Sequence, residues 1–566
     1  MRLLVTVLVT LVLGLNAQQP PSAAMPPAPK VPGMAPAAEK SLRAIDPEKI
    51  RAHVRFLASD LLEGRGPGQR GGMLAAAYVA TQFALYGLKP FGENGSYFQT
   101  VPMVNIRTLP QTTFALTAKN GDTQTLRGGE DYIATNPTLT PEADVEAPIV
   151  FVGYGINAPE YKWNDYAGAD VKGKVVLMFV NEPPSPLPAA DDSFFKGKAL
   201  TYYGRWTYKY EEAARQGAVG AILIHQTQMA SYPWTVLSRG WGAEQAFLRD
   251  DPNPKLQVRS WITLEVARRL LASSGLDIEK VMEQMRQRGF RPQPLGATLK
   301  AHIASSVRRF DGQNVIARLE GSDPARRREA VLYTAHHDHF GIVPGKAGDN
   351  IFNGAIDNAT GVAMFLELAR VFADTPPARS VVFATVDAEE QGLLGSQYLG
   401  EHPPLPASDI VLNLNFEGLF IMPVGVPDEL QVSGAERTTF YPEVGQIAHA
   451  FGMSIKPDSF PEAGYYYRSD HFSLARVGVP AFSVASGNKF AGHDESWGEA
   501  QAKDYVAHRY HQPSDEYRPE MDFRANARIA QVAFALGWRA AQPALHIDWL
   551  PGDEFEPARK RSQQAH

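Results

Sequence analysis

The chain has 566 residues, which predicts two or three folded units rather than one ordinary domain. Its 44% hydrophobic and 20% charged residues are typical of a globular protein with a sizeable core. A formal net charge of −6 shows no basic footprint for nucleic acid, and the absence of cysteine excludes disulfides, thiolate catalysis and cysteine metal sites.

The first segment, MRLLVTVLVTLVLGLNAQQP, predicts a secretory signal peptide over residues 1–17. Arg2 gives a short basic start, an apolar run extends from Leu3 to Leu13, and the small residue Ala17 marks the cleavage site. An uncleaved anchor is the alternative, but this run is shorter than the roughly 20 residues that span a bilayer. No later segment is apolar enough either, so we expect no stable membrane insertion. An exported chain without cysteine fits a bacterial periplasmic or secreted protein.

Residues 18–43 are rich in Pro, Ala and Gln, a composition typical of a disordered linker. Folded structure is expected from about Ile45. The segment DPEKIRAHVRFLASDLL has apolar residues at helical spacing, with Asp46 as a candidate N-cap. After the Gly-rich stretch GRGPGQRGG, the segment MLAAAYVATQFALYGL predicts a second helix that Gly87 ends. Residues 44–139 are therefore predicted to form the first part of a main domain.

Two regions of different character follow. Residues 140–300 predict short β elements with few helices, separated by loops that contain Pro, Trp and Tyr. Residues 301–548 predict alternating strands and helices, among them NVIARLEG, EAVLYTAHH, TGVAMFLELARVFAD and SVVFATVDAEE. Continuous apolar strands of this kind are buried on both faces, which predicts an α/β fold: a helix-covered, mostly parallel mixed sheet with an inserted β-rich domain. The charged residues 549–566 predict a frayed tail.

Polar side chains that can bind a metal follow the predicted strands. In TAHHDHFG, His336 and Asp338 stand at the end of one strand, and alternation places them on the same side. A carboxylate in that position can orient a metal-binding imidazole. The alternative is a solvated turn with chance histidines. Ligands in open α/β sheets bind beyond the carboxyl ends of the strands, where this stretch is predicted to lie.

Acidic residues share this placement. Asp357, in NGAIDNATG, lies between a strand end and a helix start, where a helix cap is the alternative. Glu389 and Glu390 follow a strand, so we expect their side chains to point opposite ways, one toward a metal and the other toward substrate as a general base. A solvated helix N-terminus is the alternative for this pair. Glu417 ends the strand VLNLNFEG, and a buried carboxylate there needs a partner.

The motif YHQPSD adds His511, with Tyr510 directly before it. A lone histidine in a loop usually has no function, and each motif has an ordinary structural explanation by itself. Together the motifs assemble imidazoles and carboxylates without cysteine. This mixture of ligands suits zinc, with cobalt and manganese as alternatives.

In chain order, the motifs AHHDH, GAIDNATG, DAEEQGLLGS, NLNFEG, SDH and YHQPSD resemble those of the co-catalytic dizinc exopeptidases. This is the group related to the bacterial secreted aminopeptidases and to glutamate carboxypeptidase, and the resemblance spans about residues 44–545. It implies two zinc ions per chain with five ligands: His336, Asp357, Glu390, Glu417 and His511.

The same resemblance implies a role for each remaining residue. Asp357 would bridge the two ions, and family members often have a cis peptide after this aspartate. Glu389 would be the general acid/base, Tyr510 would help to hold the oxyanion, and Asp338 would orient the histidine ligand beside it. Glu417 departs from the pattern, because the family usually has aspartate at this position.

Residues 140–300 resemble a protease-associated domain inserted into the peptidase, on the motifs FVGYGI, DYAGADVKGKVVLM and EEAARQGAVGAILI. In relatives such an insert covers the active site. The main domain is then a peptidase domain, with an N-terminal part at residues 44–139 and a metal-binding part at residues 301–548.

The implied function is that of an exported zinc metallopeptidase that hydrolyses peptide bonds at chain termini. Aminopeptidase activity is expected, because it is the commoner activity in the group. A carboxypeptidase, a glutaminyl-cyclase-like enzyme and a metal-free binding protein resembling the transferrin-receptor ectodomain are the alternatives. In YYYRSDHFSLARVGVP, Arg468 suits a free carboxylate and Asp470 a free amine, so the direction of attack stays open.

Overall fold

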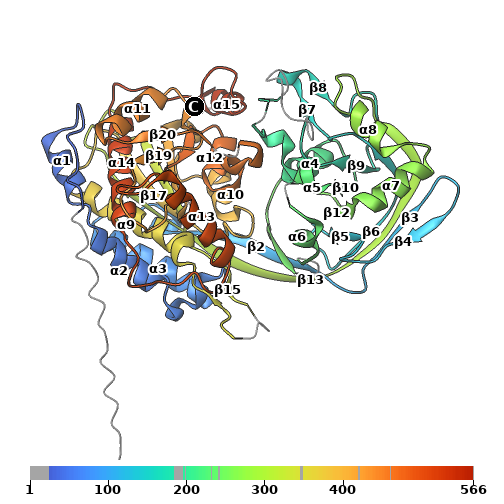
Figure 1. Ribbon diagram of the computed structural model, residues 1–566, viewed down its shortest axis with the longest axis horizontal. Coiled ribbons are helices and arrows are strands. Elements are labelled where there is room, and N and C mark those ends of the chain that lie inside the picture. Colours follow the sequence, from blue (N-terminus) through green and yellow to red (C-terminus); the bar gives the residue numbers. More distant parts are fainter. Residues whose placement is uncertain are drawn as a thin grey trace, which may run out of the picture.

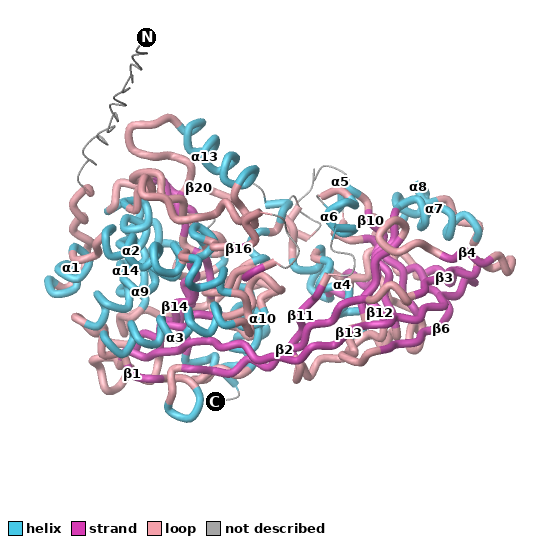
Figure 2. Tube along the Cα trace, turned by 90° about the horizontal axis from the view of Figure 1, so that it is seen from below, coloured by secondary structure: helices cyan, strands magenta, loops and turns pink. Residues whose placement is uncertain are grey.

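The computed structural model describes residues 25–183, 195–197, 199–230, 232–239, 243–343, 348–418, 421–458 and 461–564. The predicted signal peptide and the start of the predicted linker lie outside this part of the chain. Two lobes, each with its own hydrophobic core, are joined by the long strands β2 (Phe98–Thr108) and β13 (Gln293–Leu319) (Figure 1). Figure 2 shows these two strands running along one side of both lobes. No helix within the described ranges is long and apolar enough to cross a membrane.

The first lobe contains a parallel set of strands in the order β21–β18–β14–β17, which β13 extends in the antiparallel direction. Every residue of these four strands is buried. This confirms the predicted helix-covered, mostly parallel mixed sheet. The strands are β14 (Ala330–His336), β17 (Ser380–Val386), β18 (Ile410–Phe416) and β21 (Ala481–Ser483).

Successive residues of these strands face two different cores, because side chains alternate along a strand. Val331 and Tyr333 face the larger core, whereas Leu332 faces the smaller one. The helices that close the larger core include α2 (Pro47–Leu57), α3 (Arg70–Leu85), α9 (Gly361–Ala373) and α14 (Arg524–Ala540). The smaller core is closed by α10 (Leu394–Glu401) and α12 (His471–Arg476).

The predicted ends of the first long helices are confirmed. The side chain of Asp46 caps α2 by accepting a hydrogen bond from the backbone N–H of Glu48. Gly87 follows α3 with a positive φ of 78°, a conformation that glycine adopts without a steric penalty.

The second lobe continues the same sheet in the order β13–β6–β9–β10–β12–β5, with β6, β9, β10 and β12 parallel to one another. Helices α7 (Leu264–Ser273) and α8 (Ile278–Gln284) cover it, so this lobe contains more helix than the sequence predicted. Local signals were present, because Thr263 and Asp277 cap these helices. The other main elements are β5 (Tyr132–Thr135), β6 (Glu142–Phe151), β9 (Val175–Phe179), β10 (Gly220–His225), β12 (Val258–Thr263) and α4 (Trp206–Arg215).

Two terminal predictions are wrong. The predicted linker includes helix α1 (Pro36–Arg43), in which Ala38 and Leu42 are fully buried. The predicted frayed tail includes α15 (Glu556–Gln564), and the buried Arg559 donates to the backbone carbonyls of Ala407 and Ile410. Both segments have a polar or Pro-rich composition, which by itself predicts disorder. They form helices because they contact distant parts of the chain.

Short elements complete the two lobes. They are α5 (Thr227–Ala230), α6 (Trp234–Arg239), α11 (Tyr441–Ala450), α13 (Glu495–His508), β1 (Lys89–Pro90), β3 (Thr113–Thr117), β4 (Thr123–Thr125), β7 (Asn157–Ala158), β8 (Trp163–Asn164), β11 (Glu244–Leu248), β15 (Gly341–Ile342), β16 (Ile351–Phe352), β19 (Glu429–Gln431), β20 (Ser454–Lys456) and β22 (Ala485–Ser486).

Candidate metal centre

The carboxyl ends of three neighbouring parallel strands deliver acidic and imidazole side chains to one edge of the sheet. His336 is the last residue of β14, Glu417 directly follows β18, and Glu389 and Glu390 lie in the turn after β17. Parallel strands end at the same edge, so these groups converge although they are far apart in the sequence.

Asp357 comes from an irregular segment, residues 355–360, that precedes α9. The peptide bond between Asp357 and Asn358 is cis. The side chain of Asn358 donates to the carbonyls of His336 and Phe416, which ties the segment to the ends of β14 and β18. From the other side, the carboxylate of Asp515 accepts the backbone N–H of Asp357. The position of Asp357 is therefore fixed by buried hydrogen bonds on both sides.

Arg65 fastens the loops that carry these residues. Its buried guanidinium group donates to the backbone carbonyls of Leu57, His337, Asn353 and Gly354. One side chain of the Gly-rich stretch GRGPGQRGG thus holds the segment after β14 and the segment before Asp357 together. The sequence contained no signal that this arginine would be buried.

Asp357 presents its two carboxylate oxygens to two different pairs of side chains. Its Oδ1 lies 3.4 Å from Nε2 of His336, which in turn lies 3.3 Å from Oε1 of Glu417. Its Oδ2 lies 3.3 Å from Nε2 of His511, which lies 3.1 Å from Oε2 of Glu390. Two atoms that each bind a tetrahedral zinc at about 2.1 Å are about 3.4 Å apart. The spacing therefore fits two cations, one on each side of Asp357.

The charge of the cluster also favours cations. Asp357, Glu390 and Glu417 present buried carboxylates. The Oδ1 of Asp357 has no hydrogen-bond partner in the part of the chain that the structure describes. Burial raises the pKa of Glu389 well above its usual value, and the neighbouring Glu417 and Glu390 raise it further. Buried carboxylates at this density need positive charge beside them, and a divalent cation provides it.

The expectation that Glu389 and Glu390 point opposite ways along a strand is wrong. Strand β17 ends at Val386, Ala388 has a φ of +55°, and the backbone N–H of Gly392 closes a turn onto the carbonyl of Glu389. As a result, ligand atoms of Glu389, Glu390 and His336 lie within 4.8 Å of one another. The turn brings both carboxylates into the same cluster.

The structure places the two predicted supporting residues beside the cluster. The carboxylate of Asp338 accepts the backbone N–H of Glu389 at 3.1 Å and lies 3.6 Å from Nδ1 of His336. The ring of Tyr510 stacks on that of His511 with centroids 3.7 Å apart. Burial and then the negative charge of Asp357 raise the pKa of Tyr510 far above its usual value, so its hydroxyl stays protonated.

His339 also belongs to the cluster, although no role was predicted for it. It is fully buried, and its Nδ1 lies 2.6 Å from Oε1 of Glu390. His339, Asp357 and Glu390 offer atoms within 4.8 Å of one another. The only signal was a third histidine in TAHHDH. His337, by contrast, is a core residue: burial lowers its pKa to about 3, and neither ring nitrogen has a partner among the described residues.

Glu417 is held by a chain of buried hydrogen bonds that begins in the SDH motif. Its Oε2 accepts the hydroxyl proton of Ser469 at 2.9 Å, and that hydroxyl oxygen accepts from Nδ2 of Asn415 at 2.8 Å. Asn415 in turn accepts from the hydroxyl of Thr334 in β14. The alternating polar residues of NLNFEG therefore lock the longer glutamate side chain in place.

Two histidine–carboxylate groups that share one aspartate at the carboxyl edge of a parallel sheet define a candidate two-cation hydrolytic centre. Residues 314–537, the part of the chain that carries this centre, match the model of peptidase family M28.

Individual proteins are also similar to this chain. A protein described as a probable zinc metalloprotease, from Pyrenophora teres f. teres, is 28% identical over 247 residues, which are 40% of this chain and 48% of that protein. The aminopeptidase YwaD of Bacillus subtilis is 26% identical over 206 residues, 36% of this chain and 39% of that protein. The chain thus spans about half the length, or less, of these curated relatives. The solved aminopeptidase from Aneurinibacillus sp. strain AM-1 matches 91% of this chain and 98% of its own with a TM-score of 0.49 and 19% identity.

Proposed function

We propose that the protein is an exported zinc-dependent exopeptidase, and more specifically an aminopeptidase. The observation that carries this proposal is the placement of the two Asp357 oxygens against two separate histidine–glutamate pairs, at 3.1–3.4 Å within each group. The match to peptidase family M28 supports peptide as the substrate. The names of the relatives, a probable zinc metalloprotease and an aminopeptidase, support the metal and the direction of attack.

In this proposal His336 and Glu417 would hold one zinc ion, Glu390 and His511 would hold the other, and Asp357 would offer one carboxylate oxygen to each. When bound, the two ions would polarise the scissile carbonyl and lower the pKa of the attacking water. The mixed imidazole and carboxylate ligands suit zinc.

The remaining side chains have roles that follow from their positions. Glu389 takes the proton of the attacking water and later delivers it to the leaving amine, which general acid/base chemistry requires. Tyr510 keeps its hydroxyl proton and can donate a hydrogen bond to the oxyanion that develops on the substrate. The carboxylate of Asp338, 3.6 Å from Nδ1 of His336, favours the ring orientation in which Nε2 faces the centre.

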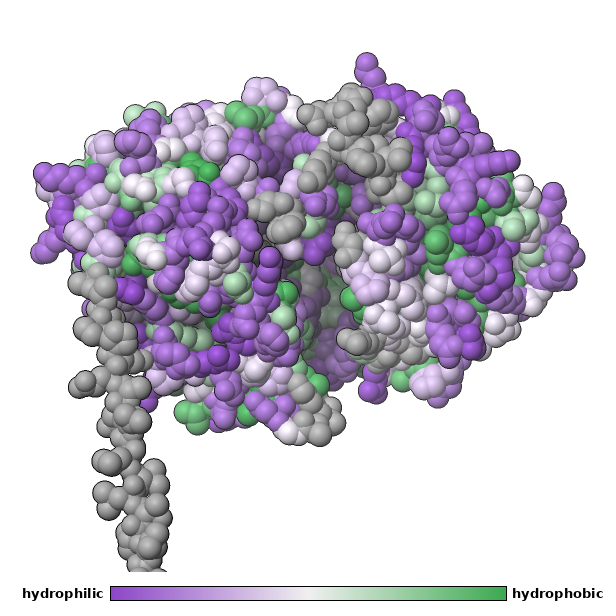
Figure 3. Space-filling model, viewed as in Figure 1, coloured by the Kyte–Doolittle hydropathy of each residue, from purple (hydrophilic) through white to green (hydrophobic). Residues whose placement is uncertain are grey.

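We also propose that residues 140–300 are a protease-associated domain that restricts access to the centre. Figure 3 shows a groove between the two lobes on the face drawn there. In the same proposal residues 44–139 and 301–548 form the peptidase domain. The first 17 residues are a leader that directs export to the periplasm or the medium.

Metal removal tests the proposed function. We expect chelation to lower kcat/KM on an amino-acid anilide by at least about a thousandfold, because the water and the carbonyl lose their activation. Adding zinc should restore activity at about two ions per chain. Dipeptides blocked at the amino or the carboxyl end separate an aminopeptidase from a carboxypeptidase, and a peptide with N-terminal glutamine detects cyclase activity. A fully active preparation without metal would refute the proposal, and a protein that binds no zinc would favour the binding-protein alternative.

A variant of Ser469 tests whether Glu417 is a metal ligand, and it does so through zinc affinity rather than through enzyme activity. The change Ser469→Ala removes the donor to Oε2 of Glu417, and we expect zinc affinity at one site to fall about 10- to 100-fold, as for other partners of metal ligands. Competition with a chelator measures this affinity. Ser380→Ala is the matched control, because Ser380 is equally buried but lies at the opposite end of the sheet. Equal affinities in the two variants would contradict a ligand role for Glu417.

A further inference from the structure

Two arginines from different lobes meet at the junction beside the candidate centre. The second lobe docks through Leu200, whose N–H donates to the carbonyl of Pro461, and through Tyr202, whose ring centroid lies 6.0 Å from that of Tyr467. Arg205 follows directly on the second-lobe side, and Arg468 lies on the first-lobe side. Neither guanidinium group has a hydrogen-bond or ion-pair partner among the residues that the structure describes.

Arg205 stands in a setting that favours an anion. Its Nε is buried without a partner. Arg205 is also the N-cap residue of α4, and no side chain caps that helix end, so its free N–H groups add positive potential. Burial, followed by the charge of Arg468, lowers the pKa of Arg205 to about 10, which places the two cationic groups near each other. Arg205 remains charged at neutral pH, and a partly desolvated cation without a counter-ion is costly.

Of the two arginines, Arg468 is the one that lies next in sequence to a residue of the candidate metal centre. It immediately precedes Ser469, whose hydroxyl donates to Glu417. Its side chain is exposed, with the guanidinium carbon 5.3 Å from the centroid of the Tyr465 ring. The nearby acidic candidate, Asp470, is fully buried. Of the two residues that the sequence left open as substrate contacts, only the arginine is accessible.

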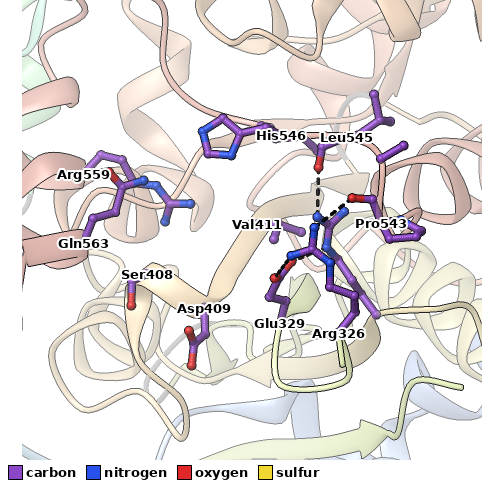
Figure 4. Close-up of a pocket in the computed structure, with 13 residues that line it drawn as sticks. Arg326, Glu329, Ser408, Asp409, Val411, Pro543, Leu545, His546, Arg559 and Gln563 are labelled. Carbon is purple, nitrogen blue, oxygen red and sulfur yellow. Dashed lines mark hydrogen bonds and ion pairs between the residues drawn. The ribbon is translucent and has the colours of Figure 1, made fainter. Parts of the chain in front are cut away.

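Other arginines of the chain differ from this pair, because their guanidinium groups bind oxygens of the protein. A pocket of about 290 Å³ beside the amino ends of β14, β17 and β18, the ends opposite the centre, is lined by Arg326, Arg379 and Arg559 among others (Figure 4). Each of these three donates to backbone carbonyls, and two also bind Glu329. Most of the guanidinium donors in that pocket therefore already bind protein oxygens, whereas neither junction arginine has a hydrogen-bond partner among the described residues.

We propose that Arg205 and Arg468, together with the N-terminus of α4, bind a carboxylate group of the peptide substrate. This inference rests on the proposed peptidase function and names the class of peptide: one that carries a carboxylate away from the bond that is cut. The carboxylate is the free C-terminus of a short peptide or an acidic side chain, since both present the same planar pair of oxygens. An arginine fork recognises that shape through paired hydrogen bonds.

Binding to the zinc-loaded Glu389→Gln variant tests the inference without turnover. Two matched pairs of probes are compared by calorimetry: trialanine with trialanine amide, and Ala-Glu-Ala amide with Ala-Gln-Ala amide. We expect the carboxylate member of at least one pair to bind about tenfold more tightly or better, the range for charge-assisted hydrogen bonds. Preference within the first pair identifies the C-terminal carboxylate, and preference within the second identifies an acidic side chain.

Arginine variants made in the Glu389→Gln protein show which residues cause the preference for a carboxylate. Arg205→Gln and Arg468→Gln should each abolish most of the preference and leave the affinity for the neutral probe unchanged. Arg249→Gln should change nothing, because that arginine already pairs with Asp311. Equal binding of all four probes, or a preference that survives both junction variants, would overturn the inference. If the wild-type protein hydrolyses peptides in a metal-dependent way but binds all four probes equally, the proposed function stands and the inference about the arginines is wrong. If the protein prefers the carboxylate probes but hydrolyses no peptide, only the proposed peptidase function is wrong.

Discussion

Replacing Glu389 by glutamine is expected to leave both zinc ions bound and to lower kcat by about a thousandfold or more. The amide has nearly the same shape as the carboxylate but cannot accept the proton of the attacking water. A positioned general base typically contributes 10²- to 10⁴-fold, and the same group must also protonate the leaving amine. The measurements are kcat and KM on an amino-acid anilide, with zinc content determined on the same sample.

Zinc content separates this explanation from structural damage. Glu320→Gln is the control, because Glu320 is a partly exposed carboxylate that pairs with Lys89 away from the centre. It should retain normal kcat and two zinc ions. If Glu389→Gln turned over substrate at the wild-type rate, Glu389 would not be the base. If it lost zinc together with activity, Glu389 would be a ligand rather than the proton carrier.

The change Asp357→Asn is expected to weaken the binding of both zinc ions at once. Among the described residues, Asp357 alone places separate side-chain oxygens beside both histidine–glutamate groups, and an amide nitrogen cannot replace the second oxygen as a ligand. Each affinity should fall by more than about a hundredfold, beyond the upper range for partners outside the ligand set. Metal content after dialysis against a weak chelator gives the result directly.

Thermal unfolding provides a second readout of the same change. A ligand at a thousand times its Kd stabilises the folded state by about 4 kcal/mol. Zinc should therefore raise the Tm of the wild-type protein clearly, and that of Asp357→Asn little. Asp522→Asn is the matched control, since Asp522 is half-buried and bonded to Arg524 instead. A variant of Asp357 that still held two zinc ions would show that the two sites do not share this carboxylate.

Much of the first lobe follows from local patterns. The continuous apolar runs at residues 330–336, 380–386 and 410–416 form the predicted buried strands, and the helical spacing after Asp46 forms the predicted helix α2. These features depend on residues a few positions apart, so a short window of sequence contains the information. The second lobe was predicted less completely, because its helices α7 and α8 are short and their caps carried the only clear signal.

The terminal helices show where local information is insufficient. Composition suggested a linker at residues 18–43 and a frayed tail at residues 549–566, yet α1 and α15 pack against the first lobe. Their order comes from burial of Leu42 and Arg559 by segments more than a hundred residues away. No window centred on either helix contains those partners.

By itself, the sequence determined which residues stand at the ends of the strands: His336, Glu389, Glu390 and Glu417, with Asp357 before α9. Strand periodicity and the parallel arrangement are enough to bring them to one edge. Only the tertiary structure decided how their atoms meet. A turn, rather than strand alternation, brings Glu389 and Glu390 into one cluster, His339 reaches Glu390, and Ser469 holds Glu417. His339 and Glu390 are 51 positions apart, and Ser469 and Glu417 are 52 positions apart. Glu389 and Glu390 lie in an irregular turn. The geometry of these contacts therefore depends on the packing of the whole lobe.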